Sequence, residues 1–484
     1  MQSSLLRLGG SALATSRGLL FRQPVVMATR GVHASAAASV GGAGAGAGAG
    51  AAASGSDGAG IAPPPKGWMR VMGIQSGNAV DGIDVGIFDF APLDRSSADP
   101  RALNRGLQYQ VVANKTYPFT RERREYVLGL RALNLADGNK YAEGHYRMGE
   151  WCAEAGLQLL SESGVDKDSV SLIGSHGQTV SGHPHWEFGD LNVIAQRTGI
   201  TAAGDFRTAD VAMGGNGTPC TCTYDSIMLR PAPGSKKWRI AINIGGTSSV
   251  TFCPPWPVDG VDAATATELT PGGLDPGLGV FFMDLATQAI DPTLEYDNDG
   301  AMARSGTVNE ALLEEFLQNK YYKQDTLPIG VGPDDFPETL FHEWHARAKE
   351  LGVSDIDLLT TLTELTAKQI AMACARFGGP NIVDGATDDV LLRGGICANS
   401  YFVERLRAQM SEQLNTNVER VKTLKDVGLD EDSWENAMYA MLGYLCYSNV
   451  YNFVPSCTGA SRPVVGGKIA PGNNFSKVVL TNAP

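Results

Sequence analysis

The segment WRIAINIGGTSSVTF (Trp238–Phe252) carries the clearest structural signal in this chain. Its first half alternates between apolar and other side chains, as a strand does. Gly245 and Gly246 then open a turn of small residues, and Val250–Phe252 has the composition of the strand that follows. The segment therefore predicts a strand, a glycine turn and a second strand.

A similar unit begins about 170 residues earlier. The apolar run Val71–Ile74 leads into the small-residue turn Ser76–Ala79, and the run Val85–Phe88 follows. Tyr109–Val112 is predicted to be a third strand of the same meander. Two copies of one unit indicate a duplicated domain, each copy heading one lobe of an α/β protein.

Helical segments and a late strand are predicted between and after these units. In Asp357–Phe377, Leu358, Leu362 and Leu365 fall on one helical face. The run Val390–Leu392 is predicted to be a strand that enters a glycine turn.

Composition excludes several classes of protein. The chain has 484 residues, of which 43% are hydrophobic and 19% charged, which excludes wholesale disorder. The formal net charge of −13 argues against a nucleic-acid partner. No uncharged apolar run reaches the roughly 18 residues of a membrane span, so no membrane partner is expected. The eight cysteines are scattered and are predicted to be free thiols.

The N-terminal region differs from the rest. Residues 1–56 hold four arginines but no aspartate or glutamate, which is typical of a transit peptide, and a Gly/Ala linker follows. We therefore expect a cytoplasmic or mitochondrial protein, with an uninformative tail before Met27 as the alternative. The predicted organisation is a tail (1–67), an N-terminal lobe (68–235), a C-terminal lobe whose last helix packs back on the first (236–450) and an extension (451–484).

Glycine turns of this kind can bind anions. Without a Cβ atom the backbone approaches a phosphate closely, and successive N–H groups converge on it. A nearby carboxylate can hold the metal ion that neutralises the phosphate oxygens. The alternative is that the turns are simple hairpins, because the chain has neither a Walker A nor a G-x-G-x-x-G motif.

A series of motifs carries a more specific signal. In chain order they are GNAVDGID (Gly77–Asp84), SHGQT (Ser175–Thr179), GDFRTAD (Gly204–Asp210), GGNGTP (Gly214–Pro219) and NIGG (Asn243–Gly246). This series resembles the anhydro-N-acetylmuramic acid kinase family, which includes fungal levoglucosan kinases. The resemblance runs from about Gly73 to about Leu445.

The resemblance implies a two-lobed actin-like ATPase and sugar-kinase fold with duplicated βββαβαβ-type domains. It implies an enzyme that opens a 1,6-anhydro sugar with water and phosphorylates O6 from ATP with Mg²⁺. The partner would be this small sugar, and homodimers are expected. The sugar could be anhydro-N-acetylmuramic acid or a plain anhydrohexose such as levoglucosan.

The same resemblance assigns roles to individual residues. By the DFR motif the general base is Asp205, with a salt bridge or helix cap as its structural alternative. His176, Gln178, Arg207 and Asp210 would bind the substrate or support its site. The ATP site would consist of Gly77, Asn78, Ala79, Val80, Asp81, Gly82, Ile83, Asp84, Gly245, Gly246, Gly394, Gly395 and Asn399. The acidic candidates near magnesium are Asp81, Asp275 and Glu435.

Several positions depart from the family's motifs, so two functions stay open. The first turn has Asn78 and Ala79 in place of two hydroxyl residues, and Pro276 follows Asp275 in place of a threonine. Each lost charged hydrogen bond costs about 1.5–3 kcal/mol. The chain is then either an anhydro-sugar kinase with shifted specificity or an inactive member that binds a sugar, nucleotide or protein. An actin-like ATPase machine is disfavoured by SHGQT and DFR.

Overall fold

The computed structural model describes residues 61–77, 80–95, 99, 101–103, 105–131, 138–182, 185–235, 237–258, 269–332, 334–378, 387–414 and 420–481. The chain divides into residues 1–45 and 46–484, and every described residue belongs to the second unit. The predicted transit peptide and most of its linker therefore lie outside the described residues, as do Asn78 and Ala79 of the first turn.

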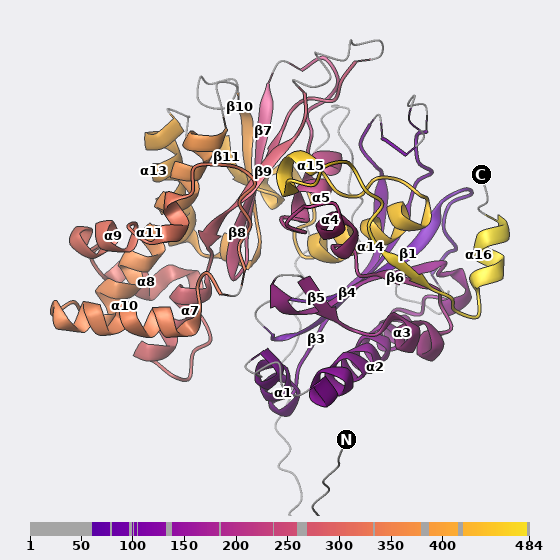
Figure 1. The fold of residues 1–484 in the computed structure, drawn as a ribbon, viewed down its shortest axis with the longest axis horizontal. Helices are drawn as coiled ribbons and strands as arrows, with labels where there is room; N and C mark the ends of the chain where they lie inside the picture. Colours follow the sequence, from indigo (N-terminus) through magenta and orange to yellow (C-terminus); the bar gives the residue numbers. More distant parts are fainter. Residues whose placement is uncertain are drawn as a thin grey trace, which may run out of the picture. The chain divides into compact units, whose positions relative to one another are not determined.

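The first sheet combines an antiparallel meander with parallel strands (Figure 1). Its strands are β1 (Met69–Ser76), β2 (Gly82–Phe90), β3 (Tyr109–Pro118), β4 (Leu172–Gly182), β5 (His185–Phe188), β6 (Ala202–Gly204) and β12 (Lys468–Ala470). The order is β12-β6-β4-β1-β2-β3, and β5 pairs with β4. Strands β1 to β3 are antiparallel neighbours, whereas β4 runs parallel to both β1 and β6.

The second sheet repeats this arrangement. Its strands are β7 (Trp238–Ile244), β8 (Thr247–Cys253), β9 (Gly272–Leu278), β10 (Thr387–Arg393) and β11 (Val421–Thr423), in the order β11-β10-β7-β8-β9. Again the first three strands form an antiparallel meander, and the fourth runs parallel to the first and to the fifth. The repetition confirms the predicted duplicated α/β fold of actin-like ATPases and sugar kinases.

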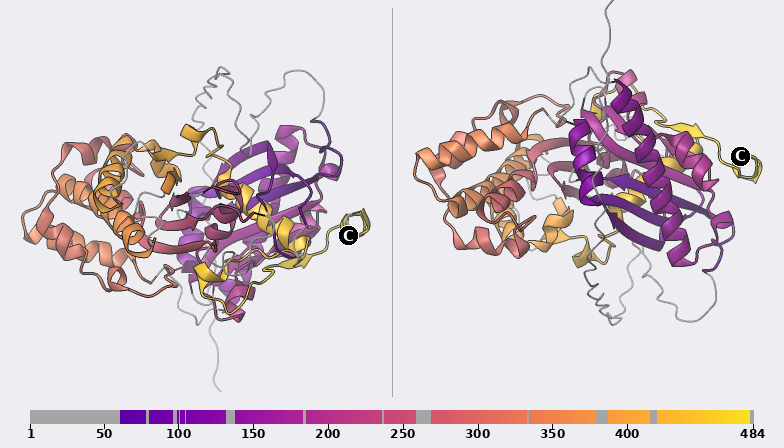
Figure 2. Two further views of the ribbon diagram at one scale, coloured as in Figure 1. Left: turned by 90° about the horizontal axis from the view of Figure 1, so that it is seen from above. Right: turned by 90° about the horizontal axis from the view of Figure 1, so that it is seen from below.

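Helices cover the two sheets. They are α1 (Arg121–Arg131), α2 (Gly138–Ser163), α3 (Leu191–Thr198), α4 (Thr208–Ala212), α5 (Thr221–Met228), α7 (Phe281–Ile290), α8 (Ala301–Ser305), α9 (Glu310–Phe316), α10 (Glu338–Glu350), α11 (Asp355–Phe377), α13 (Ser400–Leu414), α14 (Trp434–Tyr447), α15 (Pro455–Thr458) and α16 (Phe475–Thr481). The short 3₁₀ turns are η1 (Lys167–Ser169), η2 (Asn298–Gly300), η3 (Lys320–Lys323), η4 (Gly395–Ala398) and η6 (Lys425–Val427). The orange helices gather beside the second sheet, and the purple α2 packs against the first (Figure 2). No described helix is long and apolar enough to span a membrane.

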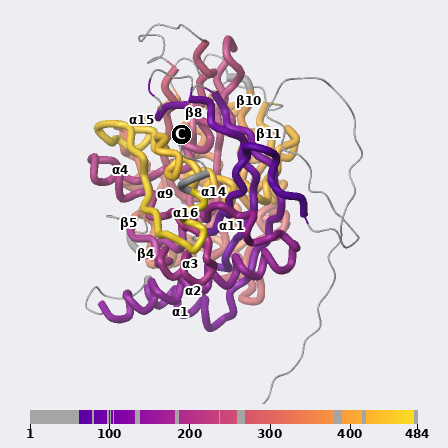
Figure 3. The backbone as a smooth tube through the Cα atoms, turned by 90° about the vertical axis from the view of Figure 1, so that its right-hand side faces the viewer, coloured from indigo at the N-terminus to yellow at the C-terminus, as the bar shows by residue number. Residues whose placement is uncertain are grey.

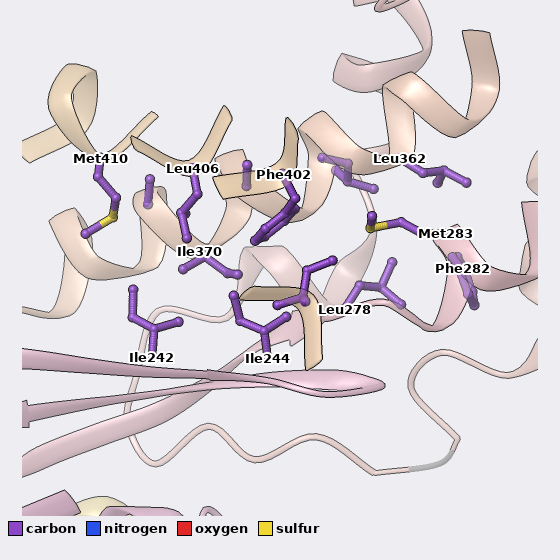
Figure 4. Close-up of a cluster of buried hydrophobic side chains, with 14 of the residues drawn as sticks. Ile242, Ile244, Leu278, Phe282, Met283, Leu362, Ile370, Phe402, Leu406 and Met410 are labelled. Carbon is purple, nitrogen blue, oxygen red and sulfur yellow. The ribbon is translucent and has the colours of Figure 1, made fainter. Parts of the chain in front are cut away.

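The core over the second sheet is built by α7, α11 and α13 (Figure 4). Ile242 and Ile244 point from β7 toward Ile370 of α11 and Phe402 of α13. Leu358, Leu362 and Leu365, the predicted apolar face of α11, are all buried. Ser354 starts this helix by accepting the amide of Asp357 with its hydroxyl.

Helix α14 lies unusually close to the first sheet. A Cβ atom on Gly73 of β1 would stand 1.9 Å from the carbonyl oxygen of Asn436, and one on Gly174 of β4 would stand 2.1 Å from that of Tyr439. Gly73 and Gly174 are paired across the two strands, so together they form a flat seat for the helix backbone. This close packing brings Glu435 to Gln75, near the carboxyl end of β1, and Tyr439 to His176 within β4.

The C-terminal segment completes the first sheet. Strand β12 pairs antiparallel with β6, and Lys468 lies opposite Gly204. Beyond the strand, the Asn474 side chain accepts the amide and hydroxyl of Thr201 and donates to the carbonyls of Val170 and Ser171. Figure 3 shows this yellow segment running beside α3. The extension therefore belongs to the fold and reaches the residue before Asp205.

Candidate active site

Asp205 stands between β6 and α4 in a strained conformation. Its φ is +54°, a left-handed value that aspartate adopts more readily than most side chains. The hydroxyl of Thr208 donates to Oδ1, and the Lys468 ammonium contacts Oδ2. The Asp205 side chain is 24% exposed. Strain of this kind persists where the surroundings fix the residue, and it clusters at functional sites.

Arg207, two residues after Asp205 at the start of α4, has a side chain that is 12% exposed and contacts three other segments. Its Nη1 donates to the Gly217 carbonyl at 2.8 Å, and its Nη2 lies 3.2 Å from His176 Nε2. Its Nε lies 3.0 Å from Glu187 Oε1. One guanidinium thus joins the DFR segment to β4, β5 and the glycine loop before Pro219.

His176 lies within β4, and its ring stacks on Tyr439 with the two ring centroids 4.5 Å apart. Because a guanidinium can only donate, His176 Nε2 must accept the hydrogen bond from Arg207. The Nδ1 atom lies 3.2 Å from the Gly177 carbonyl, which can only accept. The contacts therefore define a neutral imidazole that carries its proton on Nδ1.

Three ionisable residues that sequence reasoning missed surround this group. Burial raises the pKa of Glu187; Arg207 opposes this rise and Asp205 adds to it. Burial lowers the pKa of His145, which is also close enough to feel the charges of Asp190, Asp205 and Lys468. None of the three stood in a motif, and Lys468 reaches Asp205 only through the pairing of β12 with β6.

Gln178 and Asp210 are buried, and their side chains make hydrogen bonds to neighbouring residues of the protein. Gln178 accepts the Ser76 hydroxyl at 2.8 Å and donates to the Gly77 carbonyl at 3.2 Å, so it supports the first glycine turn. Asp210 accepts the Thr458 hydroxyl at 2.8 Å and the Gly217 amide at 2.9 Å. These contacts hold the backbone on which the more exposed site residues stand.

A group of carboxylates gathers at the first glycine turn. Gln75 Nε2 lies 2.5 Å from Asp84 Oδ2 and 3.1 Å from Glu435 Oε2. Burial raises the pKa of both acids, and the charge of Asp81 adds to both shifts. Val80, two residues before β2, has a φ of +53°, which is strained for a β-branched residue.

This donor set fits a magnesium ion bound together with phosphates. Mg²⁺ commonly takes one or two protein carboxylates and completes its shell with water and phosphate oxygens. Asp84 and Glu435 repel each other at their present positions, and a cation would relieve that repulsion. Among the described residues there is no cluster of three or more such ligands that could hold a metal by itself.

Asp275 is a buried carboxylate that feels the charge of Arg207. Its Oδ2 accepts the Thr218 hydroxyl at 3.0 Å and the Val331 amide at 3.1 Å, and its side chain is buried. Burial raises its pKa to about 7. Of the three carboxylates expected at magnesium, Asp81 and Glu435 interact electrostatically at the first turn, and Asp275 is held by Thr218 and Val331.

Asp275 should make folding stability depend on pH. Between the ordinary aspartate pKa near 3.8 and about 7, the native state keeps a proton that the unfolded chain has released. The free energy of unfolding therefore falls as pH rises through this window. We expect Asp275→Asn to lose less stability than the wild type between pH 5 and 8 in urea titrations. If the free energy of unfolding changed equally with pH in the two proteins, the assignment to Asp275 would be wrong. Burial also raises the pKa of Asp284 to about 7, so Asp284→Asn measures the share of that residue.

The second glycine turn and the late glycine pair meet at the end of β7. The carbonyls of Gly245 and Gly246 accept the amides of Val280 and Gly279 at the start of α7. Gly394 has φ +101°, and a Cβ atom there would stand 2.2 Å from the Ile244 carbonyl oxygen. Asn399 accepts the Phe402 amide at 2.9 Å and so begins α13.

Gly394 and Gly395 should respond differently to alanine. Gly394→Ala introduces both a backbone clash and an unfavourable φ, so we expect a stability loss of about 2 kcal/mol or more. A Cβ atom on Gly395 meets nothing within 4 Å, so Gly395→Ala should fold normally. If this turn faces ATP, the Gly395→Ala protein should still bind ATP more weakly. Urea titration and nucleotide titration check the pair, and equal stability of the two variants would contradict the geometry.

The duplicated sheets, each headed by an antiparallel meander, define the two-sheet α/β fold of actin-like ATPases and sugar kinases. The sequence profile of the family described as "Anhydro-N-acetylmuramic acid kinase" matches residues 69–472. The chain therefore belongs to the anhydro-N-acetylmuramic acid kinase family. The match runs past Leu445, where the motif resemblance ends, and takes in β12.

Individual relatives agree with this membership. The chain is 32% identical over 417 residues to an anhydro-N-acetylmuramic acid kinase of a Cyanothece species, covering 83% of this chain and 99% of that protein. It is 30% identical to one of a Picosynechococcus species, covering 83% and 99%. Among solved structures, a ROK hexokinase from Thermus thermophilus matches with a TM-score of 0.32 and 14% identity, covering 78% of this chain and 99% of that one.

Proposed function

We propose that this protein is an ATP-dependent kinase that opens a 1,6-anhydro sugar with water and phosphorylates the released O6. Family membership supports the reaction class. The observation that carries the proposal is Asp205, a partly exposed carboxylate on a strained backbone beside the Arg207 group. A general base needs this combination of access and fixed orientation.

In the proposed reaction Asp205 accepts a proton from water as the water oxygen bonds to the anomeric carbon. The bond between that carbon and O6 breaks, and O6 bonds to the γ-phosphorus while ADP leaves. Thr208 fixes one carboxylate oxygen, so the other must receive the proton. Lys468 contacts that second oxygen from an exposed side chain and would have to move aside when the sugar and water bind.

ATP would lie against the glycine turns of the two sheets. The connections from β1 to β2 and from β7 to β8, which begin near Gly77 and Gly245, occupy corresponding places in the duplicated meanders. Magnesium, bound to Asp84 and Glu435, would neutralise phosphate charge. Helix α14 carries Glu435 on the phosphate side and Tyr439, one turn later, on the sugar side. The two half-sites therefore share one rigid element.

A second candidate is a family member that binds ligands without turnover. It is favoured by Asp275, an expected magnesium ligand whose carboxylate is instead buried against Thr218 and Val331. In that case ATP or a sugar would bind, but no ADP would form.

ADP release from the full chain distinguishes the two candidates. The protein is incubated with Mg-ATP and either anhydro-N-acetylmuramic acid or levoglucosan, and ATP affinity is measured on the same sample. Sugar-dependent ADP release supports the kinase and identifies the better sugar. ATP binding with no release in the presence of either sugar favours the non-catalytic candidate.

A further inference from the structure

Glu187 has an unusual environment for a buried carboxylate. Its side chain is 6% exposed, and Arg207 Nε lies 3.0 Å from Oε1. That contact is an ion pair without hydrogen-bond alignment, and neither carboxylate oxygen accepts a hydrogen bond within the described residues. A buried carboxylate normally uses its oxygens as acceptors, because leaving them unpaired is costly.

The contrast with another buried ion pair shows what is missing. Arg70 and Asp89, on β1 and β2, form a pair whose side chains are 2% and 5% exposed, against 12% and 6% for Arg207 and Glu187. Asp89 nevertheless accepts two aligned hydrogen bonds from Arg70, at 2.7 and 2.8 Å. The Asp89 carboxylate is thus satisfied by hydrogen bonds within the protein, whereas both oxygens of Glu187 can still accept one.

The position of Glu187 indicates which donors could use that capacity. Its Oε1 lies 3.9 Å from His176 Nε2, and its charge interacts with that of Asp205. Arg207 already donates from Nη1 to the Gly217 carbonyl and from Nη2 to His176. The Glu187 carboxylate therefore belongs to the buried group of side chains that interacts with the candidate base Asp205, and a sugar bound at that group would bring hydroxyls that can donate.

We propose that Glu187 is a specificity-determining residue whose carboxylate accepts a hydrogen bond from a free sugar hydroxyl near the reacting carbon. This inference rests on the proposed function of the site. A polyhydroxylated anhydro sugar satisfies the carboxylate, whereas an analogue that lacks this hydroxyl leaves a buried charge unpaired. Sites built in this way discriminate strongly against the analogue that lacks the polar group.

The test is a cycle of protein and sugar changes. Wild-type protein and Glu187→Gln are each assayed with the better anhydro sugar and with its monodeoxy analogues, and kcat/KM is measured. For the wild type we expect one analogue to be worse than the parent sugar by about 10- to 100-fold, as for a charged hydrogen bond. For Glu187→Gln this preference should shrink to less than about fivefold.

A purely structural role gives a different result. If Glu187 only neutralises Arg207, Glu187→Gln should lower kcat/KM by the same factor for every sugar, so the ratios between sugars stay unchanged. Glu187→Asp, which keeps the charge, covers the case in which the amide variant folds poorly. Asp89→Asn breaks the other buried pair and should leave the sugar preferences as in the wild type.

The outcomes separate this inference from the proposed function. A wild-type protein that acts on no anhydro sugar overturns the proposed function and this inference with it. A wild-type protein that is active, with Glu187→Gln and Glu187→Asp showing the same preference among analogues, overturns only the role of Glu187.

Discussion

Asp205→Asn is expected to lower kcat for sugar phosphorylation by about 10³-fold, while ATP affinity stays within about twofold. Asparagine has nearly the same shape, tolerates a left-handed φ and can still accept the Thr208 hydroxyl. It cannot take a proton from water, so the loss isolates the base from the geometry. Steady-state rates with Mg-ATP and direct titration of ATP measure the two quantities.

Asp166→Asn is the matched control for this substitution. Asp166 caps η1 in the same half of the chain, where its side chain accepts the Asp168 amide. We expect its kcat to equal that of the wild type. A kcat for Asp205→Asn within about tenfold of the wild type would remove Asp205 from the role of base.

Arg393→Met is expected to cause the largest loss of stability, about 3–5 kcal/mol in the free energy of unfolding. Arg393 ends β10, and its guanidinium meets Asp225 of α5 at 2.9 Å with both side chains fully buried. Burial raises the pKa of Asp225, and Arg393 opposes that rise. Without the arginine, the carboxylate is left as a buried charge, and Thr251 is its one remaining side-chain donor among the described residues.

A surface pair provides the comparison for Arg393. Arg347 contacts Glu315 at 3.0 Å, but both side chains are nearly half exposed. Arg347→Met should therefore cost less than about 1 kcal/mol in the same urea titration. If Arg393→Met cost no more than Arg347→Met, the buried pair would not be what joins β10 to α5.

The sequence predicted the architecture because the fold repeats a simple local pattern. Strand, glycine turn and strand occur twice, and the observed sheets have the same order around each copy. The apolar face of α11 followed from its spacing and is buried. The close seat of α14 could not be predicted, because it depends on Gly73 and Gly174 becoming neighbours in different strands.

The candidate site was predicted only in part, for a related reason. Motifs pointed to Asp205, Arg207 and His176, and the structure brings these residues together. Glu187, His145 and Lys468 have no motif, and they reach the group only through strand pairing and helix packing. Asp275 is the opposite case. It stands in a motif, but its environment is set by Thr218 and Val331, which lie far from it in the sequence.

The most direct test of the account is the mass of the reaction product. The full chain is incubated with Mg-ATP and an anhydro sugar, and the products are separated and weighed by mass spectrometry. The account predicts a species equal to the sugar plus one water and one phosphoryl group, formed together with ADP and absent with Asp205→Asn. ADP formed without any phosphorylated sugar, or a phosphorylated sugar that has gained no water, would contradict it.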